Sequence, residues 1–130
     1  MILLIQPYLP SPITTLSLKG KGAVNYAYYV ETEDGSKYIV KQEREDKEFQ
    51  PQNNLVVEAH VIQKLRLEGL RFPIPEVVFI SETPHMYGYK YVEGELLRGV
   101  WSSLTENEKI HICKSLGKFH AEIGKKFSKD

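Results

Sequence analysis

Two glycines and an asparagine, Gly20, Gly22 and Asn25, stand close together between two segments that have the composition of β-strands. Because glycine has no side chain, the backbone N–H groups of such a turn can approach a phosphate group directly. A dinucleotide-binding fold would place a helix immediately after the turn, whereas here the tyrosine-rich segment 26–32 follows, which excludes that fold. Two interpretations stay open: a phosphate-binding loop and an ordinary glycine-rich hairpin turn.

A lysine near the end of the next strand-like segment, Lys41, is the second candidate. Alternation along a strand places Ile39 and Lys41 on one face, and Tyr38 and Val40 on the other. An apolar residue two positions before a lysine could cover a nucleotide base while the ammonium group reaches phosphate oxygens. The alternative is a solvated lysine at the end of a strand.

A glutamate on the helical segment that follows, Glu58, is the third candidate, because apolar residues surround it on the same helix surface. A half-buried carboxylate needs a partner, and Lys41 on a neighbouring strand would supply one. The alternative is an exposed Glu58 that pairs with Lys64 or Arg66 on its own helix.

The segment 87–94, with the sequence Tyr-Gly-Tyr-Lys-Tyr-Val-Glu-Gly, is the fourth candidate. It leaves a strand-like stretch and precedes a helix, so its backbone C=O and N–H groups could contact the edge of a purine. The alternative is a turn between two domains.

Strand-like segments surround these candidates. The sequence predicts strands over 14–19, 26–32, 37–42, 76–80 and 86–92. An Asp-Gly pair at 34–35 predicts the turn between the second and third strands, and residues 1–42 are expected to form mostly an antiparallel meander.

Two helices complete the predicted order of elements. An apolar stripe predicts a helix over about 54–67 that ends before Gly69, after a polar connection over 43–54. A capping box formed by Thr105 and Glu108 predicts the start of a second helix, which continues to about residue 126. We therefore expect an α+β fold, with a five-stranded antiparallel sheet and one helix over residues 1–94, followed by a linker and a helix over 95–130.

In this order, the glycine turn, strand lysine, helix glutamate and strand exit resemble the N-terminal lobe of kinases. The details look closer to the aminoglycoside phosphotransferase and choline-kinase-like family than to protein kinases, since Asn25 stands where protein kinases have a third glycine. The stretches Phe72–Pro75, Gly88–Gly94 and Leu116–His120 are similar to the corresponding stretches of that family. The resemblance covers about residues 14–124.

The resemblance implies a site for ATP or GTP on one face of the sheet. The residues that it implicates are Gly20, Gly22 and Asn25 for the phosphate loop, Ala27 and Ile39 for the roof over the base, Lys41 held by Glu58 for phosphate contact, and Tyr89, Lys90 and Val92 for the hinge. Tyr89 would occupy the gatekeeper position, where its bulk would narrow the deep part of an adenine site and favour GTP over ATP.

The family's catalytic residues, an Asp, an Asn and a second Asp that bind metal and substrate, would follow the last predicted helix. The chain has three aspartates, Asp34, Asp46 and Asp130, and none is followed by the downstream Asn. We therefore expect no catalytic residue and no metal site in this chain, Mg²⁺ only if a missing lobe is supplied, and weak nucleotide binding. The resemblance thus implies the nucleotide-binding lobe of a small-molecule kinase that is truncated and catalytically incomplete.

Composition limits the alternatives. The 17 basic and 17 acidic residues cancel, which argues against sequence-independent binding of nucleic acid. The single cysteine, Cys113, excludes an internal disulfide and is expected to be a small core residue, and the apolar segment 1–5 is too short to span a membrane, so we expect a cytoplasmic protein. The four histidines, which lack zinc-site spacing, are His60, His85, His111 and His120.

The last predicted helix has an apolar stripe with few expected partners in the chain. This stripe predicts contact with a complementary C-terminal lobe or with a second copy of the chain. A different function stays open from the sequence: a kinase-like lobe that binds a protein partner without catalysis.

Overall fold

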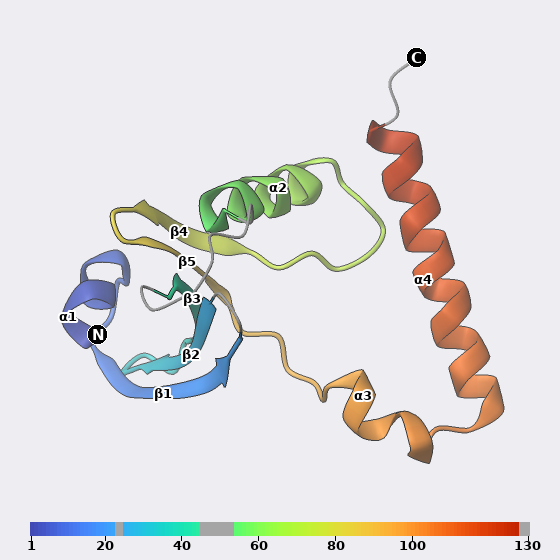
Figure 1. Ribbon diagram of the computed structural model, residues 1–130, viewed down its shortest axis with the longest axis horizontal. Helices are drawn as coiled ribbons and strands as arrows, with labels where there is room; N and C mark the ends of the chain where they lie inside the picture. Colours follow the sequence, from blue (N-terminus) through green and yellow to red (C-terminus); the bar gives the residue numbers. More distant parts are fainter. Residues whose placement is uncertain (23–24, 45–53, 128–130) are drawn as a thin grey trace.

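A five-stranded antiparallel sheet forms the centre of the molecule (Figure 1). The computed structural model describes residues 1–22, 25–44 and 54–127. The strands, which lie in the order β1-β2-β3-β5-β4, are β1 (Ile13–Lys21), β2 (Asn25–Thr32), β3 (Lys37–Glu43), β4 (Val77–Glu82) and β5 (His85–Lys90). The predicted α+β fold with five antiparallel strands is confirmed.

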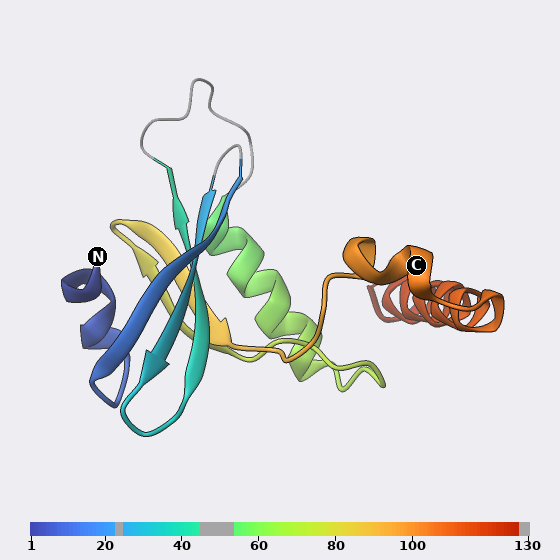
Figure 2. The same ribbon diagram turned by 90° about the horizontal axis from the view of Figure 1, so that it is seen from below.

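The sheet lies between two helical elements of unequal size (Figure 2). The helix α2 (Leu55–Leu67) covers one face, and the short α1 (Ile2–Ile5) with the 3₁₀ turn η1 (Gln6–Tyr8) covers the other. Beyond the sheet the chain forms α3 (Leu97–Val100), the 3₁₀ turn η2 (Trp101–Ser103) and the long α4 (Glu106–Phe127).

The face under α1 holds the larger apolar core. Its buried strand residues are Val30, Tyr38, Val40, Phe79 and Met86, and the N-terminal segment adds Ile5 and Leu9. The expectation that residues 1–42 are mostly a meander is confirmed by β1, β2 and β3, and the first eight residues form two short helical turns that bury Ile5 against the sheet. The Gln6 side chain fixes this segment, since its Oε1 accepts a hydrogen bond from the Ile13 N–H at 2.8 Å.

The face under α2 holds a second, smaller core of Leu55, Ala59 and Tyr87. Asn54 caps α2, because its side-chain oxygen accepts a hydrogen bond from the Val56 N–H at 2.8 Å. After α2, Gly69 has φ +67°, a left-handed conformation that glycine adopts without strain, so the predicted end of the helix is confirmed.

The two turns of the first three strands differ from each other. At the second turn, the predicted Asp34–Gly35 hairpin is confirmed, with Gly35 at φ 84°. Hydrogen bonds from Thr32 and from the Ser36 N–H lower the pKa of the Asp34 carboxyl. The glycine turn is tighter than predicted, because Gly20 lies within β1 and residue 25 already begins β2. Residues 23–24 of this turn, and most of the predicted connection over 43–54, lie outside the described residues.

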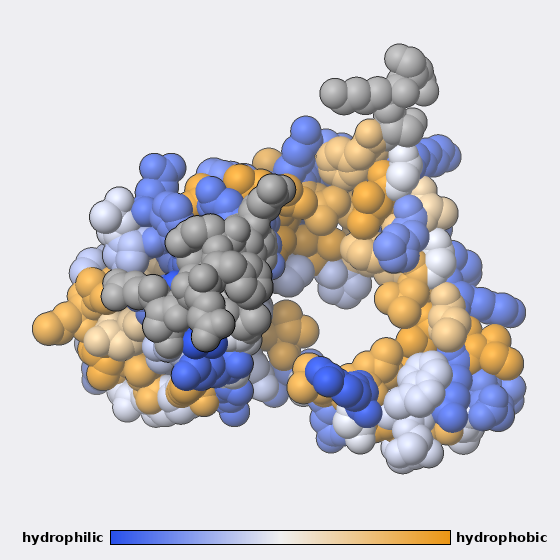
Figure 3. Space-filling view, viewed as in Figure 1, coloured by the Kyte–Doolittle hydropathy of each residue, from blue (hydrophilic) through white to orange (hydrophobic). Residues whose placement is uncertain are grey.

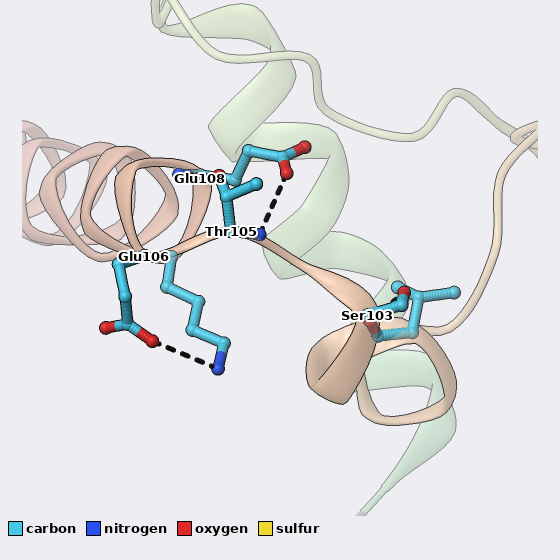
Figure 4. Close-up of polar contacts among 6 residues, drawn as sticks. Ser103, Thr105, Glu106 and Glu108 are labelled. Carbon is cyan, nitrogen blue, oxygen red and sulfur yellow. Dashed lines mark hydrogen bonds and ion pairs between the residues drawn. The ribbon is translucent and has the colours of Figure 1, made fainter.

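The helix α4 begins at the predicted capping box (Figure 4). The Thr105 N–H donates to Glu108 Oε1 at 2.9 Å, and the Glu108 N–H donates to the Thr105 hydroxyl oxygen at 3.1 Å. The helix stands apart from the sheet (Figure 1). At its C-terminal end the Phe127 ring centroid lies 5.6 Å from the Lys64 ammonium of α2, and α4 also approaches the loop before β4. There the rings of Phe72 and Phe119 meet edge to face at 5.3 Å, and the Arg71 N–H donates to Glu122 at 2.9 Å.

Candidate functional site

An ion pair between Lys41 on β3 and Glu58 on α2 lies at the centre of the site face, by which we mean the sheet face covered by α2. The Lys41 Nζ lies 2.9 Å from Glu58 Oε1 and 3.1 Å from Oε2. The two side chains remain 25% and 32% exposed, so a ligand can reach them. The predicted partnership is confirmed, and the local alternative is not what the structure has, because the Arg66 guanidinium contacts the Ile74 carbonyl oxygen at 2.8 Å instead.

Strand register places the expected base-covering residues beside this pair. Ala27 lies opposite Lys41 in the β2–β3 ladder, and directly opposed residues in an antiparallel pair share a face. Ile39, two residues before Lys41, lies on the same face and is half-buried, so it offers apolar surface without being sealed in the core. Tyr38 and Val40 point into the other core, as the alternation of the strand predicted.

Two tyrosines of β5 continue the site face beyond Lys41. In the β3–β5 ladder Tyr87 lies opposite Lys41 and Tyr89 opposite Ile39. Tyr87 is 1% exposed, and its ring centroid lies 5.9 Å from Lys41 Nζ. Burial raises the pKa of Tyr87 far above its usual value and raises that of Tyr89 as well, and the negative charge of Glu58 adds to both effects. Both phenols therefore stay neutral and can act as hydrogen-bond donors.

The glycine turn lies at the end of β1 and β2, next to the end of β3. Among the described residues, a side-chain carbon on Gly20 would meet only the Ala27 Cβ, at 4.0 Å, so these residues leave the space over Gly20 open. The Gly22 N–H, in contrast, donates to the Asn25 carbonyl oxygen at 2.9 Å, and the Gly22 carbonyl oxygen accepts from Arg44 at 2.7 Å. A phosphate that used the Gly22 N–H would have to displace the bond to Asn25.

Arg44 is a cation that the sequence reasoning did not single out. Besides contacting the Gly22 carbonyl, its guanidinium lies 5.4 Å from the ring centroid of Tyr26 on β2. Its position in the sequence could have indicated this role. Arg44 follows β3 three residues after Lys41, and in an antiparallel pair the end of β3 lies beside the start of β2, where the glycine turn is.

The expected hinge residues differ in which backbone groups they leave available. The Lys90 N–H donates to the Glu76 carbonyl oxygen at 2.9 Å, so it is occupied by the sheet edge. Within the described part of the chain, no backbone hydrogen bond uses the N–H of Val92, which lies just beyond β5. The Lys90 side chain is held by Glu76 at 2.9 Å. Of the two residues, Val92 has the free N–H that a base edge would need.

The histidines and the cysteine do not form a metal site with the site face in the described part of the chain. Among residues 1–22, 25–44 and 54–127, no three His, Cys, Asp or Glu side chains lie close enough to hold a metal ion. His85 pairs with Glu43 at 2.8 Å, and Cys113 is exposed on α4, so the expectation that it is a core residue is wrong. In the described chain, no helix combines the length and the apolar character that crossing a membrane requires.

A comparison with known families shows which family the chain belongs to. The pattern that defines the phosphotransferase enzyme family matches residues 15–125, which include every residue of the site face described above. The chain belongs to this family. No curated protein matches the chain significantly.

Two solved structures resemble this member of the phosphotransferase family in fold. One is described as a fructosamine-3-kinase from Thermobifida fusca, with 18% identity, TM-score 0.54, and coverage of 74% of this chain and 32% of that one. The other is the aminoglycoside phosphotransferase APH(2'')-IIa in a ternary complex with streptomycin and ATP, with 20% identity, TM-score 0.54, and coverage of 82% of this chain and 33% of that one. The chain thus spans about a third of the length of each structure, and the predicted kinase-like N-terminal lobe is confirmed.

Proposed function

We propose that the site face binds a nucleoside triphosphate, ATP or GTP, as the nucleotide-binding lobe of a small-molecule kinase. The observation that carries this proposal is the Lys41–Glu58 pair, because it sets a partly exposed ammonium group beside the glycine turn. ATP bound in the related aminoglycoside phosphotransferase supports the choice of ligand.

In this proposal each part of the nucleotide meets a different part of the face. The base lies under Ala27 and Ile39, with the Val92 N–H at its edge. Lys41 contacts the phosphates. The glycine turn takes the terminal phosphates once the bond from the Gly22 N–H to Asn25 has opened.

The proposal assigns binding but not transfer to this chain on its own. Phosphoryl transfer depends on metal ions held by carboxylates and on a positioned acceptor group. Of the three aspartates, Asp34 is engaged with Thr32 and Ser36 at a hairpin, and Asp46 and Asp130 lie outside the described residues. We assign nucleotide binding to residues 1–94 and expect Mg²⁺ and the acceptor to require the second lobe, of which 95–130 is the beginning.

Isothermal titration of ATP and GTP into the purified chain tests this proposal. Lys41→Ala should weaken binding by about tenfold or more, the loss typical of a charged hydrogen bond to phosphate. Lys37→Ala is the matched control, because Lys37 lies on the same strand but pairs with Glu93 at the far end. Equal binding by the wild-type chain and the Lys41→Ala variant would contradict the proposal. GTP should bind more tightly than ATP if Tyr89 narrows the site, and Tyr89→Ala should reduce that difference.

A second function, docking of a protein partner, is favoured by the surface of α4. Ile110 and Leu116 are each 51% exposed, and a groove of about 300 Å³ lies between α4 and Phe72. Figure 3 shows apolar residues at the surface over α4 and the linker before it. The partner that we propose is a complementary C-terminal lobe or a second copy of the chain. Sedimentation at micromolar concentration tests the second copy, and a monomer would exclude it.

A further inference from the structure

We propose that Tyr87 is a positioning residue of the nucleotide site, which holds Lys41 and Glu58 together through its ring and its hydroxyl group. This inference deepens the proposed function and rests on it for its consequence in nucleotide binding. The structural part, that Tyr87 fixes the pair and with it the position of α2, is testable separately.

Tyr87 lies under the ion pair of Lys41 and Glu58. It lies on β5 directly opposite Lys41, so its ring projects from the same sheet face toward α2. The ring centroid lies 5.9 Å from the Lys41 ammonium, within the range of a cation–π contact. At 1% exposure, the Tyr87 side chain has no freedom to turn away.

Tyr87 also packs against α2, the helix that carries Glu58. Tyr87 forms one buried cluster with Leu55 and Ala59, which lie one turn before Glu58 and directly after it. The same side chain thus packs against α2 and supports Lys41. Because interiors are closely packed, α2 cannot move outward without opening this cluster.

A tyrosine suits this position better than a purely apolar residue because it adds a hydroxyl group to the ring. A buried phenol needs a polar partner. Glu58 Oε1 lies 2.9 Å from the Lys41 ammonium, which itself lies 5.9 Å from the centroid of the Tyr87 ring, so the ion pair brings a carboxylate close to Tyr87. When the Lys41 ammonium contacts the phosphates of a nucleotide, its ion pair with the Glu58 carboxylate becomes weaker. The Tyr87 hydroxyl remains available to Glu58 at that moment, so the carboxylate and α2 keep their places.

Two substitutions separate the contributions of ring and hydroxyl. Tyr87→Phe removes only the hydroxyl, and Tyr87→Leu also removes the ring. The matched controls are Tyr28→Phe and Tyr28→Leu, because Tyr28 is a half-buried tyrosine that packs against the core on the opposite face. We expect Tyr87→Leu to weaken ATP binding about tenfold and Tyr87→Phe about threefold, with less than a twofold change for both controls.

A double-mutant cycle with Glu58→Gln distinguishes positioning from general packing. If the hydroxyl acts through the carboxylate, Tyr87→Phe should have little further effect on ATP binding in the Glu58→Gln background. Additive effects of the two substitutions would overturn the assignment of the hydroxyl. Unchanged ATP binding by Tyr87→Leu would overturn the assignment of the ring.

Amide hydrogen exchange along α2 keeps the inference separable from the proposed function. Tyr87→Phe should speed exchange in the turn around Glu58, and Tyr28→Phe should not. If the wild-type chain bound no nucleotide, the proposed function would fail, while faster exchange in Tyr87→Phe would still support the positioning role. Unchanged exchange would overturn that role whatever the nucleotide does. Tyr87→Phe decides the matter if Tyr87→Leu does not fold.

Discussion

Gly88, between the two tyrosines of the site face, is the position where the structure allows the sharpest prediction. A Cβ at this position would lie 2.9 Å from Phe79 Cδ1 and 3.0 Å from Cζ, and would overlap Cε1. Phe79 cannot easily move away, because it is buried in the core under α1 and stacks on Tyr8 with ring centroids 4.7 Å apart. Gly88→Ala should therefore strain β5 and the core together.

The size of the effect follows from two opposing contributions. Overpacking a closely packed core costs about 1–3 kcal/mol. The backbone of Gly88 is not among the positive-φ glycines, so alanine lowers the entropy of the unfolded chain and recovers about 0.4–1 kcal/mol. The free energy of unfolding should fall by about 1–2 kcal/mol, and ATP binding should weaken as well, since β5 carries Tyr87 and Tyr89.

Urea unfolding followed by circular dichroism measures this change. Gly99→Ala on α3 is the control, because a Cβ there meets nothing within 4 Å. Phe79→Leu should partly rescue Gly88→Ala, with a favourable coupling of at least about 0.5 kcal/mol in the double-mutant cycle. A Gly88→Ala variant as stable as the wild type would refute the reasoning, and so would additive effects of the two substitutions.

Two further predictions concern local structure. Asp34→Ala should weaken the hairpin and reduce the dependence of the free energy of unfolding on pH in the acid range. The folded-state pKa of Asp34 is lowered from 3.8. The Asp34 carboxylate therefore stabilises the fold above pH 3.8, and this stabilisation is lost as the pH falls through the lower, folded-state pKa. Urea unfolding at a series of acidic pH values measures this, and an unchanged pH dependence would contradict it. Thr105→Ala should cost α4 about 1 kcal/mol by removing the cap on the Glu108 N–H, and should lower helicity measured by circular dichroism. Ser102→Ala, in the 3₁₀ turn before it, is the control, and equal helicity in both variants would count against the capping role.

Local chemistry explains which features could be predicted from the sequence. The alternation of a strand determined that Ile39 and Lys41 share a face, and the capping box determined where α4 begins. The left-handed conformations of Gly35 and Gly69 follow from the residue type at those two positions. Each of these features depends on contacts between near neighbours in the chain, so the sequence carries the information in a short window.

Tertiary packing decided the features that the sequence left open or predicted wrongly. The N-terminal residues form a helix because Ile5 finds an apolar sheet face to cover, and that face exists only after the strands have assembled. Glu58 pairs with Lys41 because α2 packs against β4 and β5 and also touches β3, although a partner on its own helix was equally available to the sequence. Tyr87 lies under Lys41 because β5 pairs with β3 in one register, and a shift of one residue would have turned it into the opposite core. Register and packing join residues that are distant in the chain, and for that reason only the folded molecule brings the site together.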